Sequence, residues 1–103
     1  MREYTLTHLS DTALLRDLAA LLARDRITTA TLLAHIAEVD ARKLYRPAGY
    51  PSMHAYCVDE LHLSEDAAKK RIQAARASRQ LPMLFTALAE GRLHVGALCM
   101  LAP

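Results

Sequence analysis

The stretch "LHLSEDAAKKRIQAARASRQ", residues 61–80, decides the fold because it combines a turn, a helix cap and a long helical run. Ser64 can cap a helix, and Glu65 and Asp66 fill the first turn, where the helix dipole favours acids. The cations that follow lie toward the C-terminal end, which the dipole also favours. The sequence therefore predicts a helix from about residue 64 to residue 79, preceded by a tight turn.

A shorter helix is predicted just before this turn, over "MHAYCVDEL", residues 53–61, with Ser52 as its cap. Met53, Tyr56, Cys57 and Leu61 are expected to point inward. Two helices joined by a short turn fit the outline of a helix-turn-helix. The turn position usually takes Gly because its φ is positive, and His62 is tolerated there at some cost. A plain helix pair with a solvated basic face is the alternative interpretation.

The longer helix separates into a buried and a polar side when its residues are placed about 100° apart. The buried stripe is formed by Ala68, Ile72 and Ala75. A polar row lies roughly 80° away and consists of Lys69, Gln73, Arg76 and Gln80. Cations and amides of this kind can meet phosphates and base edges in a major groove.

Eight residues are therefore candidate DNA contacts. Five lie on the predicted second helix of the pair: Lys69, Lys70, Gln73, Arg76 and Arg79. Three lie in an earlier basic cluster, where they would grip phosphates: Arg42, Lys43 and Arg46. The acids around the turn, which repel phosphates, shift the expected contact to the middle and end of the helix: Asp59, Glu60, Glu65 and Asp66.

The rest of the chain is also predicted to be mainly helical. Apolar residues make up 52% of the 103 residues and are mainly Leu and Ala, which are strong helix formers. Further helices are predicted over residues 11–25, 28–44 and 83–90 and from about 94, with a loop over 45–52. The first has an apolar face of Leu14, Leu15, Leu18, Leu21 and Leu22. We expect an all-α fold, a small bundle of about five to six helices containing a helix-turn-helix-like pair, as one domain over residues 1–103.

Several classes of function find no support in the residues. The chain has no Asn, no Gly-rich phosphate loop and no Cys or His pair at metal-ligand spacing, so we assign no catalytic residue, no metal site and no cofactor. The two cysteines are expected to be free thiols. No apolar run is long enough to span a membrane, and we expect a cytoplasmic protein. Because the chain ends on "GALCMLAP", we expect it to be the N-terminal part of a longer protein.

A region of about residues 32–102, which includes five short motifs in order and the later stretch "LAEGRLHVGALCMLAP", carries a family resemblance. The motifs are "EVDARKLY" at 38–45, "GYPS" at 49–52, "AYC" at 55–57, "LHLS" at 61–64 and "RIQAAR" at 71–76. Together they resemble the N-terminal helical region of bacterial HNH endonuclease family proteins.

The resemblance implies a non-catalytic helical domain that binds or positions DNA. In that family the nuclease is a separate C-terminal His-Asn-His module, which binds a divalent metal and cuts DNA. None of those residues is present here, so a metal is implied only if such a module follows. A protein-interaction or dimerisation module, favoured by the Leu-rich first helix, and a stand-alone helical transcriptional regulator are the alternatives.

Overall fold

The structure, a computed structural model, describes residues 4–101. It contains α1 (Asp11–Arg42), α2 (Met53–Ala55) continued by the π-helical turn η2 (Tyr56–Glu60), α3 (Glu65–Gln80), α4 (Met83–Ala89) and α5 (Val95–Leu101). No strand occurs within these residues, which confirms the predicted all-α bundle. None of the helices in the described range is long and apolar enough to cross a membrane.

The first helix is longer than predicted. The sequence predicts separate helices over 11–25 and 28–44, but α1 runs unbroken for 32 residues. The junction holds no Gly or Pro, and its β-branched residues cost only a few tenths of a kcal/mol each in a helix. Thr28 and Thr29, where the sequence predicts the start of the second helix, lie inside α1. The Thr31 hydroxyl donates to the carbonyl of Ile27 at 3.1 Å within the same helix.

Both ends of α1 are capped. At the start, Ser10 Oγ accepts from the amide of Ala13 at 3.1 Å. At the end, Lys43 adopts a left-handed φ of 54°, and the amides of Lys43 and Leu44 donate to the last carbonyls of the helix at 3.1 Å. This is the position that Gly most often fills, so the backbone of Lys43 terminates α1 while its side chain stays exposed.

Helix α3 lies at the centre of the bundle and contacts α1, α2, η2, α4 and α5. The predicted stripe of Ala68, Ile72 and Ala75 is buried, with at most 5% exposed. Burial extends further than predicted, because Ala74, Ala77 and Ser78 are covered as well. The small side chains allow neighbouring helices to approach α3 from several sides, which leaves only one sector of α3 open to solvent.

The helix-turn-helix outline is present in modified form. Ser52 Oγ and Ser64 Oγ accept from the amides of Ala55 and Ala67 at 3.0 and 3.1 Å, as predicted from the caps. His62 occupies the turn with a φ of 60°. The first helix of the pair widens into η2, however, and this leaves Leu61 43% exposed, so the prediction that Leu61 points inward is wrong.

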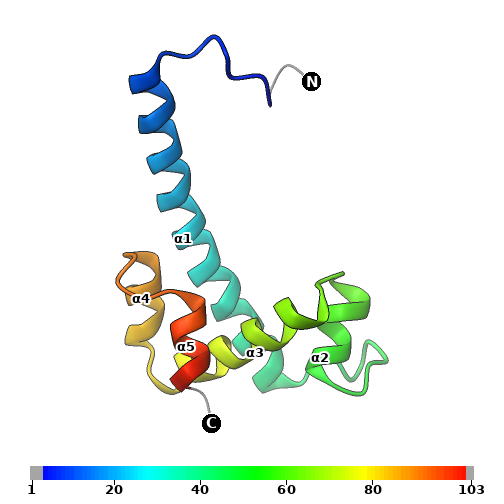
Figure 1. Ribbon diagram of the computed structural model, residues 1–103. Helices are drawn as coiled ribbons and strands as arrows, with labels where there is room; N and C mark the ends of the chain where they lie inside the picture. The colour runs from blue at the N-terminus through cyan, green and yellow to red at the C-terminus, as the bar shows by residue number, and fades with distance from the viewer. Residues whose placement is uncertain (1–3, 102–103) are drawn as a thin grey trace.

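The core is confined to one half of the molecule. Leu33 on α1, Cys57 on η2 and Leu98 on α5 are fully buried. The N-terminal half of α1 stands clear of this body as an arm, and its leucines are exposed (Figure 1). The radius of gyration is 16.5 Å, against about 13 Å for a globular chain of this length, and the longest dimension is 49 Å. The predicted apolar face of residues 14–22 therefore packs on nothing within residues 4–101.

This division of α1 predicts two different responses to mutation. Leu33→Ala removes a side chain with 0% exposure and should lower the free energy of unfolding by about 2–5 kcal/mol, since it leaves a cavity. Ile27→Ala, on the same helix but 55% exposed, should change it by less than about 0.5 kcal/mol. Urea unfolding followed by circular dichroism measures both. Equal losses in the two variants would contradict the observed placement of the core.

Candidate nucleic-acid interface

The polar row of α3 lines a hollow on the surface. Lys69, Gln73 and Arg76 face the start of α2, and with Ser52 and His54 they enclose most of a volume of about 310 Å³. The remaining lining residues are Met53 and Ile72, so the hollow has a polar rim over an apolar floor and no acidic residue in its lining. Three of the eight predicted DNA contacts are therefore brought together in one place.

Arg76 is held in position by α1. Its Nε and Nη2 donate to the two carboxylate oxygens of Asp40 at 2.8 and 2.9 Å. Asp40 is the more covered partner, with 17% of its side chain exposed against 58% for Arg76. The hydrogen bonds to Asp40 raise the pKa of Arg76, against a smaller opposing effect of burial. This two-point contact joins α1 to α3 and fixes the plane of the guanidinium group.

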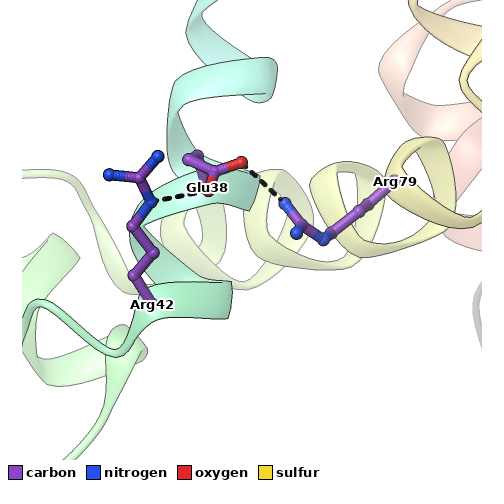
Figure 2. A network of polar contacts seen from close by, with 3 residues as sticks. All are labelled: Glu38, Arg42 and Arg79. Carbon is purple, nitrogen blue, oxygen red and sulfur yellow. Dashed lines mark hydrogen bonds and ion pairs between the residues drawn. The ribbon is translucent and has the colours of Figure 1, made fainter.

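Arg42 and Arg79 share a single carboxylate. Figure 2 shows Glu38 between them, and its two oxygens accept from Arg42 Nε at 2.7 Å and from Arg79 Nη1 at 3.0 Å. The Glu38–Arg42 pair lies within α1 at a spacing of four residues, which favours such ion pairs, whereas the bond to Arg79 crosses to α3. The two predicted DNA contacts thus have part of their charge balanced inside the protein.

The two arginine contacts lower the pKa of the Glu38 carboxyl. Hydrogen bonds from Arg42 and then from Arg79 lower its pKa below the ordinary value of 4.5, and the positive charges of both act in the same direction. A lowered pKa means that the folded state favours the ionised form. The interaction therefore stabilises the fold above the ordinary pKa, and the stabilisation is lost as the pH falls through the lowered pKa.

The other predicted contacts lie apart from the hollow. Lys70 pairs with Asp66 at 3.1 Å across one turn of α3, with both side chains exposed. Lys43 and Arg46 follow the end of α1, and both are exposed. Within residues 4–101, Lys43, Arg46 and Lys69 form no ion pair at 4 Å or less, so these three cations remain available to a ligand.

Two members of the hollow were missed by the sequence reasoning. Ser52 was recognised as a cap and His54 as a helical residue, but neither was linked to the polar row of α3. The link requires the turn at His62 to fold α2 back against the middle of α3, and no local spacing encodes that angle. None of the acids at the turn lines the hollow, although Asp66 pairs with Lys70 on α3.

The tyrosines near the loop act as anchors. Tyr50 and Tyr56 are half-buried and meet edge to face, with ring centroids 5.4 Å apart. The Tyr50 hydroxyl donates to Glu60 Oε1 at 3.1 Å, which ties the loop to η2. These contacts fix the loop of residues 45–52 against η2.

The remaining reactive side chains form no chemical constellation in the described part of the chain. Cys57 is buried and Cys99 is half-buried, and both are free thiols, as predicted. Burial raises the pKa of Cys57, and the charge of Asp40 adds to this effect. Among residues 4–101, no three His, Cys, Asp or Glu side chains gather as the ligands of a metal ion would.

Comparisons of the chain with protein-family models, with curated proteins and with solved structures gave no match. The resemblance to HNH endonuclease family proteins therefore rests on the sequence of residues 32–102 alone.

The lowered pKa of Glu38 leads to a prediction for the pH dependence of stability. As the pH falls from about 6 to about 3, the wild-type protein should lose more free energy of unfolding than Glu38→Gln, which cannot ionise at this position. Urea unfolding at several pH values measures the difference. Asp59→Asn, which alters an exposed carboxylate that forms no ion pair within residues 4–101, is the control and should follow the wild-type curve more closely. Parallel curves for wild type and Glu38→Gln would show that the Arg42 and Arg79 contacts do not persist in solution.

Proposed function

We propose that this chain is a non-catalytic helical domain that binds or positions DNA in an HNH endonuclease-like protein. The observation that carries the proposal is the hollow between α2 and α3, because Lys69, Gln73 and Arg76 line it and no acid does. The resemblance of the motifs supplies the nuclease context.

Each of the three side chains suits a different part of a nucleic acid. The Lys69 ammonium has no ion-pair partner within residues 4–101 and is exposed, which suits a phosphate. The Gln73 amide can donate and accept, as contact with a base edge requires. Arg76 uses Nε and Nη2 for Asp40, so its Nη1 group is left to donate to a ligand from a fixed orientation.

The charge of the hollow also limits the kind of binding. Asp40 balances Arg76, and Glu38 balances part of Arg42 and Arg79, so the uncompensated charge near α3 is small. Few phosphates are then neutralised, and the proposal implies weak binding with little sequence discrimination. Such a domain would add affinity and orientation to a nuclease that supplies the chemistry.

A test compares two neighbouring lysines. Lys69→Ala should weaken binding to a short labelled DNA duplex, measured by fluorescence anisotropy between about 50 and 200 mM salt, and should reduce the slope of log K against log salt by about one. Lys70→Ala removes the same charge from the adjacent residue, which pairs with Asp66 and does not line the hollow, and should have the smaller effect. Gln73→Ala should weaken binding without changing the salt slope.

Arg76→Ala is unsuitable as the decisive variant, because it also breaks the contact with Asp40 and so loosens α1 from α3. Absence of DNA binding at low salt would refute the proposal. Equal effects of Lys69→Ala and Lys70→Ala would show that the hollow is not the contact.

A further inference from the structure

The arm of α1 presents an apolar surface without a partner in the described structure. Its exposed leucines are between 40% and 66% accessible: Leu14, Leu15, Leu18, Leu21 and Leu22. The body meets α1 only from about Asp25 onward, where Asp25, Arg26 and Thr29 line a cavity together with residues of the α4–α5 connection. Figure 1 shows the earlier turns of α1 extending away from all other helices.

The leucines follow the spacing of a coiled coil. Exposed residues alternate at intervals of four and three along one stripe of α1: Leu14, Leu18, Leu21, Asp25, Thr28 and Leu32. Leu15 and Leu22 flank the stripe on one side, and Asp17 and Arg24 flank it on the other. A helix with this stripe is suited to lie against another helix of matching pattern.

We propose that the arm pairs with the arm of a second copy of this chain as a short antiparallel coiled coil. In an antiparallel pair, the Asp17–Arg24 flank of one helix faces the Asp17–Arg24 flank of the other helix, and the two Leu15–Leu22 flanks also face each other. Asp17 of each copy then lies opposite Arg24 of the other, which gives two ion pairs. Leu18 packs against Leu21 in the two central layers, and Leu15 lies beside Leu22 on the apolar flank.

Charge selects this arrangement over two others. A parallel pair in register places Asp25 of one copy against Asp25 of the other inside the stripe, where two desolvated carboxylates repel. An antiparallel pair shifted by one heptad places Asp17 opposite Asp17. Only the proposed register brings every charged residue of the Asp17–Arg24 flank opposite a residue of the other sign.

The charged flank is free to make these contacts. Asp17 accepts only a long contact of 3.4 Å from Arg16, and the two side chains are 51% and 72% exposed. Arg24 forms no ion pair within residues 4–101. The proposal goes beyond DNA binding and involves other residues, so either can fail without the other.

The first experiment tests the apolar stripe with matched variants. Leu18 and Ile27 are each 55% exposed and lie about 180° apart on α1, so Leu18→Gln and Ile27→Gln alter the folded monomer to a similar extent. Sedimentation equilibrium, without DNA and over a range of concentrations, should show wild type and Ile27→Gln approaching twice the monomer mass of 11.4 kDa. Leu18→Gln should raise the dissociation constant by about tenfold or more.

The second experiment tests orientation and register by exchanging charges. Asp17→Arg and Arg24→Asp should each weaken self-association by about tenfold, because each turns both ion pairs into repulsion. An equimolar mixture of the two variants, and the double variant Asp17→Arg/Arg24→Asp, should regain wild-type association. Ala23→Asp, which adds a charge at an exposed position about 140° from Leu18, is the control and should leave association nearly unaltered.

Three results would overturn the proposal. A wild-type chain that stays monomeric at all concentrations would show that something other than a second copy covers the arm. Equal association of Leu18→Gln and Ile27→Gln would place any dimer contact elsewhere. Loss of association in Leu18→Gln without recovery in the charge-exchanged mixture would exclude the antiparallel register.

Discussion

The contact between Asp40 and Arg76 is a two-point polar link that constrains how α1 lies against α3. It connects the C-terminal end of α1 to the middle of α3, the two longest helices, at a point next to the buried alanines of α3. α3 in turn contacts every other helix of the body. With the guanidinium held by two hydrogen bonds, the open sector of α3 faces one direction, and the hollow beside α2 is formed there.

Local signals in the sequence predicted the ends of elements well. Ser52 and Ser64 cap helices, and His62 takes the positive φ. Each of these depends on a side chain or a backbone torsion within three residues, so the neighbouring sequence is sufficient. The stripe of Ala68, Ile72 and Ala75 was likewise predictable, because periodicity alone assigns the buried side of a helix.

Features that depend on distant parts of the chain were not predictable in the same way. Glu38 and Arg79 are 41 residues apart, and Asp40 and Arg76 are 36 apart, so the cations of α3 looked free in the sequence although two of them bind carboxylates of α1. The apolar face of residues 14–22 posed the opposite problem. Periodicity shows that a face is apolar, but not whether the chain contains anything to cover it.

Within the motifs that resemble HNH endonuclease family proteins, some residues make contacts inside the protein and others do not. Asp40 of "EVDARKLY" holds Arg76 of "RIQAAR", and Cys57 of "AYC" is buried with a pKa that Asp40 helps to raise. Glu38 and Arg42 pair within the first motif. These residues are accounted for by packing and ion pairing within this chain, so they carry little information about DNA. Lys43 of the first motif and Gln73 of the last, with the neighbouring Lys69, form no ion pair of this kind within residues 4–101, so they are the residues on which the proposed DNA contact depends.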